Sequence, residues 1–302
     1  MVPGITRYID PLLDFSFKKI FGSEENKELL ISLLNELFRG RKEIIDLVYG
    51  KNEHPGDLKG EGGAIFDVLC IADKGGHFLI EVQRGKQRNF MKRALFYAAR
   101  QISGLAPKGK PKDWKYDFTE VYLIAILDDF TLAIRPPDQY LNDICLCDRY
   151  TGEIIHDEFG FIFIELLNFT KSEHELETNL DKWLYLLKNM STMTEIPPAF
   201  QEPIFEKLFN IAEYSNLTKE EKMDHDRRQK YIWDNKNVMD YAIEEGTERG
   251  LETGKEIGRE IGIQEGQQQK ALRIAKELKK INLSVEMIAM ATELPVEEVE
   301  RL

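Results

Sequence analysis

AIFDVLCIADKGGHFLIEVQRG, at residues 64–85, is the stretch of sequence that decides the fold. Two runs rich in β-branched and aromatic side chains, at about 64–72 and 78–84, flank a pair of glycines and predict a β-hairpin. Asp67 and Glu81 interrupt these runs, although such positions ordinarily select apolar side chains. The hairpin is therefore expected to carry carboxylates into a part of the chain that is otherwise buried.

The length of the hairpin turn decides whether these carboxylates meet. A three-residue loop at 74–76 places Asp67 and Glu81 on one face as diagonal neighbours, with Gln83 beside them. A two-residue turn at 75–76 sends the two acids to opposite faces. The sequence leaves both registers open, and only the first brings the acids together.

Carboxylates that meet on neighbouring strands repel one another unless a proton or a cation lies between them. Oxygen ligands without a partnering Cys or His suit a hard cation, Mg²⁺ or Mn²⁺. Asp14 lies on the expected inward face of a helix predicted from Asp10-Pro11 to about Phe21, and it is a third candidate ligand. Lys18, one turn later, would neutralise Asp14 or contact phosphate. The structural alternative is that the acids pair with basic residues of the next helix.

Charge is distributed unevenly along the chain. The net charge is −12, yet no acidic residue lies between Glu81 and Asp113. The rest of the chain carries 32 basic and 53 acidic side chains. A cationic segment on an anionic protein predicts a local site for phosphate, whereas the alternative is a solvated helix face. The segment contains nine basic residues: Arg84, Lys86, Arg88, Lys92, Arg93, Arg100, Lys108, Lys110 and Lys112.

The remaining pattern up to about residue 190 alternates between helices and strands. Its order predicts an α/β unit with a mixed central sheet flanked by helices. The Ser172-x-x-Glu175 motif is a capping box, and it predicts a helix that ends near Met190. The other expected elements are helices at about 24–38 and 86–103 and strands at 119–127, 131–134, 143–148 and 161–168.

Beyond residue 190 the sequence is helical. Thr218-x-x-Glu221 caps a long polar helix to about Glu245, and glycine then recurs at every fourth position from 246 to 266. Each glycine costs about 1 kcal/mol in a helix relative to alanine, so the repeat indicates either close helix–helix packing or a marginal helix or spacer. The sequence favours the second interpretation.

The tail predicts short helices with turns near Asn282 and Leu294-Pro295. Its acidic last helix would be repelled by phosphate, so the tail is expected to be a packing or oligomerisation module. The predicted organisation is an α/β domain at 1–190, a helical extension at 191–245, the glycine segment at 246–269 and a helical module at 270–302.

The composition is that of a globular protein, with 302 residues, 42% hydrophobic and 31% charged. No signal-like N-terminal segment is present, and the longest apolar run, Val121–Leu127, is too short to cross a bilayer. The three cysteines are expected to be reduced thiols. We therefore expect a cytoplasmic protein without a membrane segment.

The pattern Asp67-x₁₃-Glu81-Val82-Gln83, preceded by "DFSFKKIF" at 14–21, resembles the PD-(D/E)xK nuclease superfamily. More closely, the chain resembles the bacterial recombination-promoting nuclease (Rpn) and transposase family. Supporting matches are "FDVLC", "IEVQ", "FMKRALFYAARQI", "ELETNLDKWLYLLKNM" and the glycine-repeat tail. The similarity spans roughly residues 5–270.

This resemblance implies a restriction-endonuclease-like core in which Asp67 and Glu81 bind the metal and Asp14 completes the acidic cluster. Gln83 stands where the superfamily usually has lysine, and it could orient a water molecule. Arg93 and Tyr97, one helical turn apart, would hold phosphate or support Glu81.

The predicted function is a metal-dependent DNA endonuclease with little sequence specificity, associated with recombination and mobile elements. One alternative is a DNA-binding protein that keeps the nuclease fold but is catalytically weak or inactive. Another is an assembly protein that forms homo-oligomers through its C-terminal helices. The expected DNA-binding residues are Lys18, Arg84, Lys86, Arg88, Lys92, Arg93, Tyr97 and Arg100.

Overall fold

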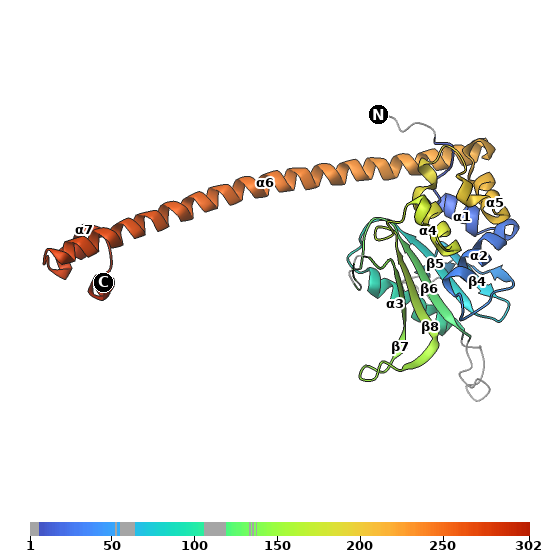
Figure 1. The fold of residues 1–302 in the computed structure, drawn as a ribbon, viewed down its shortest axis with the longest axis horizontal. Coiled ribbons are helices and arrows are strands. Elements are labelled where there is room, and N and C mark those ends of the chain that lie inside the picture. Colours follow the sequence, from blue (N-terminus) through green and yellow to red (C-terminus); the bar gives the residue numbers. More distant parts are fainter. Residues whose placement is uncertain are drawn as a thin grey trace. The chain divides into compact units, whose positions relative to one another are not determined.

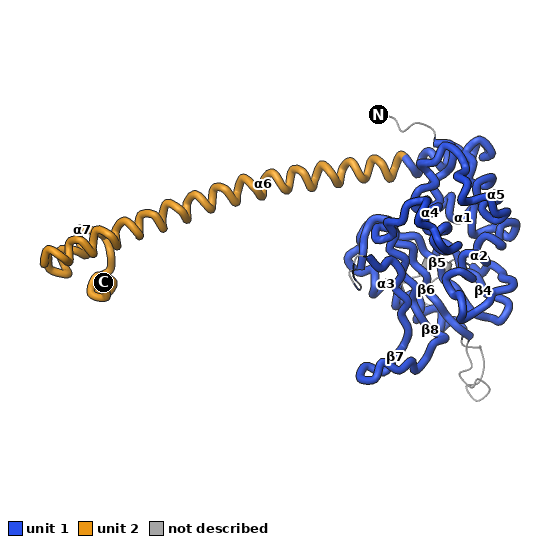
Figure 2. The backbone as a smooth tube through the Cα atoms, viewed as in Figure 1, with its two compact units in different colours: residues 1–229 blue, residues 230–302 orange. Residues whose placement is uncertain are grey.

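The computed structural model describes residues 6–51, 53–54, 64–105, 119–132, 134, 136 and 138–302. The chain divides into two compact units, which Figure 2 colours separately: unit 1 is residues 1–229 and unit 2 is residues 230–302. Among the described helices, none is both long and apolar enough to cross a membrane.

A mixed sheet forms the centre of unit 1 (Figure 1). Its two inner pairs, β5–β6 and β6–β8, are parallel, and its outer pairs are antiparallel. The described residues place six strands in this sheet in the order β1 (Leu47–Tyr49), β4 (Val68–Ala72), β5 (His77–Gln83), β6 (Val121–Leu127), β8 (Ile154–Glu165) and β7 (Leu141–Cys147). A small separate sheet pairs β2 (Glu53–His54) with β3 (Ala64–Ile65).

Helices cover both faces of the sheet because its strands are apolar on both sides. One face carries the even-numbered core residues of the hairpin, such as Val68 and Ile80, and it packs against α1 (Asp14–Phe21), α2 (Lys27–Leu37), α4 (Asn179–Asn189) and α5 (Pro203–Ala212). The other face carries Leu69 and Leu79 and packs against α3 (Phe90–Gly104). The short 3₁₀ helices are η1 (Glu24–Asn26), η2 (Glu173–Glu175), η3 (Met190–Thr192), η4 (Pro198–Phe200) and η5 (Tyr214–Asn216).

This architecture confirms the predicted fold class, a mixed sheet flanked by helices and followed by a helical C-terminal region. In Figure 1, α3 lies on one side of the sheet and the other helices of the core lie on the opposite side. The helix α3 is also the crossover that connects β5 to β6, as a parallel strand pair requires.

The β4–β5 hairpin adopts neither of the two registers that the sequence left open. Leu69 pairs with Leu79, which leaves a three-residue turn at 73–75, one residue earlier than the predicted loop. Gly75 takes the last position of the turn with φ +87°, a left-handed conformation that glycine adopts without strain. In the predicted three-residue register Leu79 would pair with Ile71, two residues away from its observed partner Leu69. Because this shift is an even number of residues, each side chain stays on the predicted face of the sheet.

Several element boundaries also differ from the prediction. The first helix begins at Asp14 because the Asp10 carboxylate accepts the Leu12 N–H (2.9 Å) in a turn that precedes it. The predicted strand at 131–134 does not form in the described part of this segment. Instead, the Leu132 N–H is bound by the Glu165 carboxylate (2.9 Å).

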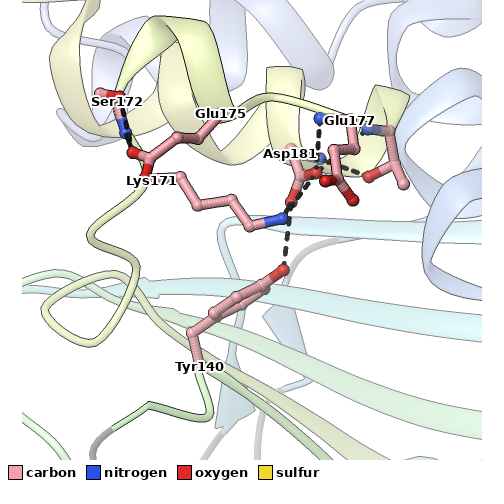
Figure 3. A network of polar contacts seen from close by, with 7 residues as sticks. Tyr140, Lys171, Ser172, Glu175, Glu177 and Asp181 are labelled. Atoms are coloured by element: carbon pink, nitrogen blue, oxygen red, sulfur yellow. Dashed lines mark hydrogen bonds and ion pairs between the residues drawn. The ribbon is translucent and has the colours of Figure 1, made fainter.

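The start of α4 is fixed by a buried acid that the sequence did not single out (Figure 3). The Ser172–Glu175 capping box opens only η2, whereas Thr178 and Asp181 form a second box that opens α4. The Asp181 carboxylate also accepts hydrogen bonds from Lys171 Nζ (2.9 Å) and Tyr140 Oη (3.1 Å). Asp181 thus connects α4 to the edge of the sheet.

The 62-residue helix α6 (Lys219–Lys280) begins inside unit 1 and continues through unit 2. Its start confirms the predicted capping box, because the Glu221 N–H donates to Thr218 Oγ1 (3.2 Å) and the Thr218 N–H donates to Glu221 Oε2 (2.8 Å). The glycine repeat is helical throughout, and a Cβ built at each of its glycines meets nothing within 4 Å among the described residues.

A small core holds the C-terminal end of unit 2 together. The helices α7 (Val285–Thr292) and α8 (Val296–Arg301) pack on the end of α6 around Ala275, Ile288 and Val299. The turn after α6 contains Asn282 with φ 62°, close to the predicted position.

Candidate active site

The three predicted acids come from three elements of unit 1. Asp14 is the first residue of α1, Asp67 lies at the bend before β4, and Glu81 is in β5. The carboxyl groups of Asp14 and Asp67 share a hydrogen bond, and Asp67 Oδ2 also accepts the Val82 N–H (2.7 Å). Residues 14 and 82 thus position Asp67 at the end of the hairpin opposite its turn.

The proton affinities of the two contacting acids differ. Burial, together with the charge of Asp14, raises the pKa of Asp67 to about 6, against the opposing effect of the Val82 N–H. Burial acts in the same direction on Asp14, but hydrogen bonds and charges from Lys18 and Arg228 outweigh it and lower the pKa of Asp14. Asp14 therefore ionises first, and Asp67 keeps its proton to a higher pH.

Glu81 is the third member of this electrostatic group. Burial raises the pKa of Glu81, and the charge of Asp67 adds to that effect while Arg93 opposes it. Arg93 Nη2 donates to Glu81 Oε1 (2.6 Å). The second oxygen, Glu81 Oε2, is buried and has no hydrogen-bond partner among the described residues.

The amide of Gln83, which the resemblance aligns with a position where lysine is usual, is fully engaged. Gln83 Oε1 accepts from Arg93, while Gln83 Nε2 donates to the carbonyl oxygens of Arg84 and Gly85 (3.1 Å each). The guanidinium of Arg93 therefore lies between Glu81 and Gln83 and supplies a positive charge that glutamine cannot. Tyr97 flanks this guanidinium, with its ring centroid 5.9 Å from Arg93 Cζ.

The cations beside Asp14 include one that sequence reasoning missed. Lys18 Nζ lies 2.6 Å from Asp14 Oδ1, as the helical spacing predicted, and Arg228 Nη1 lies 2.7 Å from Asp14 Oδ2. Arg228 is in the first turns of α6, and its Nε also pairs with Asp224 (3.0 Å). No spacing in the sequence relates residue 228 to residue 14, so only the fold could reveal this contact.

The donor set was compared with what a metal ion requires. In the part of the chain that the structure describes, no three Asp, Glu, His or Cys side chains converge closely enough to hold a metal ion together. Asp14 and Asp67 are in contact, and Arg93 holds Glu81. All the available donors are carboxylate oxygens, which suit a hard divalent cation, and the orphan Glu81 Oε2 is an unused donor. The chemistry of these donors suits such an ion, although the three acids do not converge on one point in this structure.

The predicted DNA-binding residues fall into two groups. Lys86, Arg88 and Lys92 are exposed and border a cavity of about 290 Å³ between the start of α3 and Phe130. Arg84, in contrast, is ion-paired with Asp10 and Asp128, so it braces the loops behind the acids. Arg100 is half-buried on α3. Lys108, Lys110 and Lys112 lie outside the described residues.

Comparison with known protein families identifies the family of this chain. The family model described as PD-(D/E)XK nuclease family transposase matches residues 11–242, which include the sheet, all three acids and Arg228. The chain belongs to this family. Membership in the PD-(D/E)XK nuclease transposases indicates a nuclease associated with mobile elements, and it agrees with the mixed six-stranded sheet of the described residues. No curated protein and no solved structure matches the chain.

Proposed function

We propose that this PD-(D/E)XK family protein is a Mg²⁺- or Mn²⁺-dependent endonuclease that hydrolyses DNA phosphodiester bonds with little sequence specificity. The observation that carries the proposal is the contact between Asp14 and Asp67, with Glu81 coupled to them by charge. Acids that are held this close raise one another's pKa unless a cation accompanies them. The family description supports an association with mobile elements, and we propose recombination or transposition as the cellular setting.

Each residue of the site has a distinct role in this proposal. Asp14 and Asp67 hold the ion, and Glu81 contributes Oε2 as the third ligand. When bound, the ion supplies Lewis-acid stabilisation and lowers the pKa of an attacking water. Gln83 fixes Arg93, and Arg93 places positive charge where charge develops on the phosphate. Tyr97 keeps the Arg93 guanidinium in place.

DNA contact is assigned to the exposed basic residues around α3. Lys86, Arg88 and Lys92 are in reach of solvent, and no described acid pairs with them. Contacts to the phosphate backbone position DNA without reading its bases, which accounts for low sequence specificity. We also propose a cytoplasmic location, where the protein would meet DNA.

Plasmid nicking is the test of this function. Wild-type protein is expected to nick supercoiled plasmid with Mg²⁺ or Mn²⁺ and to be inactive in EDTA, and Asp67→Ala should lose nicking at least a hundredfold in rate. Glu153→Ala, which removes an exposed acid in the turn between β7 and β8, is the matched control and should retain full activity. Nicking by Asp67→Ala at the wild-type rate would rule out this site.

A catalytically weak DNA-binding protein is the second candidate function. The observation that favours it is the fully engaged amide of Gln83, which supplies no ammonium at that position of the site. This candidate predicts salt-sensitive DNA binding that survives EDTA, together with no cleavage by any divalent ion.

Unit 2 is proposed to bind a second copy of the chain. Its helix α6 exposes apolar side chains, and these are unusual on a solvated helix when they are this frequent. Light scattering should give a dimer or larger mass for the full chain and a monomer mass for a chain that ends at residue 245. The exposed apolar residues include Val238, Ile243, Leu251, Ile257, Ile261 and Ile263.

A further inference from the structure

The cations that neutralise Asp14 line a cavity beside this acid. Its volume is about 500 Å³, and it lies between α1 and the first turns of α6. Lys18, Lys19 and Arg228 line it, and all three belong to unit 1. Lys19 is held by Glu221 (2.6 Å), whereas Lys18 and Arg228 both pair with the single carboxylate of Asp14.

We propose that Lys18 and Arg228 form a phosphate-binding subsite that is released when Asp14 takes up a divalent ion. This inference rests on the proposed nuclease function and adds a residue, Arg228, that holds a backbone phosphate of the DNA next to the ion. Asp14 has one negative charge and two cationic partners. If that carboxylate binds an ion instead, Lys18 and Arg228 both lose their contact with Asp14 and face additional positive charge. The phosphate of the substrate is the anion that restores the balance.

The geometry of Arg228 suits this exchange. Its Nε stays anchored to Asp224 (3.0 Å), so only Nη1, now on Asp14, needs a new acceptor. The planar guanidinium can then present two donors to phosphate oxygens, and Lys18 adds a point charge on the same side.

Changing partners costs little because these ion pairs are partly exposed. The side chains of Lys18 and Arg228 are 42% and 41% exposed. Ion pairs with that much access to water contribute little stability, so a divalent ion can displace them.

The chain provides a matched control one residue away. Arg227 has the same charge and lies on the same turn of α6, but its side chain is 74% exposed and its contact with Asp224 is longer (3.8 Å). Arg227 is not among the residues that line the cavity. A general effect of charge on DNA affinity would therefore appear equally in Arg227→Gln and Arg228→Gln.

The experiment measures DNA affinity of the full chain over a range of KCl concentrations, with a short duplex and either Ca²⁺ or EDTA. With Ca²⁺, Arg228→Gln should weaken binding severalfold and reduce the slope of log K against log[KCl] by about 0.9, the value for one lost phosphate contact. Arg228→Lys should restore most of the slope, and Arg227→Gln should match wild type. In EDTA, where Asp14 keeps Arg228, wild type and Arg228→Gln should have the same slope.

The possible outcomes separate this inference from the proposed function. Equal slopes for Arg228→Gln and Arg227→Gln with Ca²⁺ would overturn the subsite. Loss of nicking by Arg228→Gln with an unchanged slope would also overturn it, because Arg228 would then act only by positioning Asp14. Absence of wild-type nicking with Mg²⁺ and Mn²⁺ would instead reject the nuclease function, whatever the slopes are. A thermal melt of each variant confirms that it is folded.

Discussion

The buried carboxyl group of Asp67 lowers the stability of the folded protein when it is ionised. Its pKa rises from 3.8 to about 6 on folding, so the native state binds this proton more tightly than the unfolded chain does. The free energy of unfolding therefore falls as the pH rises from about 4 to about 6, and the cost persists at higher pH. The proposed role of Asp67 in binding an ion would account for such a cost.

Asp67→Asn should consequently stabilise the metal-free protein. Asparagine can still accept the Val82 N–H and can donate to Asp14, but it carries no charge. At pH 8 in EDTA, urea denaturation is expected to show a gain of about 1–3 kcal/mol, and at pH 4 the gain should vanish. Adding Mg²⁺ should stabilise wild type and leave the variant unchanged. Destabilisation at pH 8 would contradict the assignment of a buried charge.

At the scale of single residues, the sequence predicted the local members of the site and missed the distant one. Asp67 and Glu81 stood out because acids interrupt strand patterns, and Lys18 followed from helical spacing with Asp14. Arg93 was included because it belongs to the acid-free basic segment and because the family resemblance implied a role for it. Arg228 carries no such signal, since a basic residue on a polar helix is ordinary.

Among the elements, α4 depends on one buried carboxylate. Burial acts to raise the pKa of Asp181, but Lys171 and the N–H groups of Thr178 and Glu177 together lower it. A lowered pKa means that this stabilisation is present above about pH 4 and is lost as the pH falls below the folded value.

Asp181→Asn should therefore destabilise the protein at neutral pH. The amide group would face two backbone N–H donors and Lys171, so accepted hydrogen bonds would be lost at a cost of about 2–3 kcal/mol at pH 7. The difference from wild type should shrink below pH 4. Glu175→Gln, which alters the exposed capping box beside it, is the control and should melt close to wild type. An unchanged stability of Asp181→Asn would mean that the contacts of Tyr140 and Lys171 with residue 181 do not depend on its negative charge.

The glycine repeat of α6 offers a second test among the elements. Its period of four residues advances about 40° around the helix with each repeat, so the glycines do not share one straight face. No described atom approaches them, and each costs about 1 kcal/mol in helical propensity. Gly254→Ala with Gly258→Ala should slow amide hydrogen exchange across 246–266 by at least tenfold. Faster exchange, or a smaller assembly by light scattering, would show that another backbone packs closely on the glycines.

Helices and strands were predicted correctly where residues close together in the sequence determine them. Alternating and continuous apolar runs located β5 and β6, and the Thr218 capping box located the start of α6. The predicted strand at 131–134 was wrong, although the composition of this segment is strand-like. The N–H of Leu132 donates to the Glu165 carboxylate, which lies far away in the sequence, and not to a neighbouring strand. The predicted hairpin turn was displaced by one residue, because either of the two adjacent glycines could adopt the left-handed conformation that the turn requires.

The whole molecule is acidic, yet Lys86, Arg88 and Lys92 form an exposed basic group at the start of α3. Replacing Arg88 and Lys92 by glutamine should lower DNA affinity and reduce the salt slope by about 1.8, the value for two phosphate contacts. Lys236→Gln with Arg259→Gln removes the same charge from exposed positions of unit 2 and is the control. Equal effects of the two double variants would indicate only a general electrostatic attraction.

The fold class was the most predictable property of the whole molecule. Apolar strands that are buried on both faces require helices on both sides, and the order of elements then leaves few topologies. The cavity beside Asp14 was not predictable, because its walls come from segments about 200 residues apart that only tertiary packing brings together.

The odd number of residues in the β4–β5 turn limits how this protein can change length. Inserting or deleting one residue between Ala72 and Gly76 would exchange the two sides of β4, which would turn Val68 away from its apolar layer and Asp67 away from its partners. A change of two residues would keep both sides. Natural variants of this hairpin should therefore differ in length by even steps wherever the acids are retained.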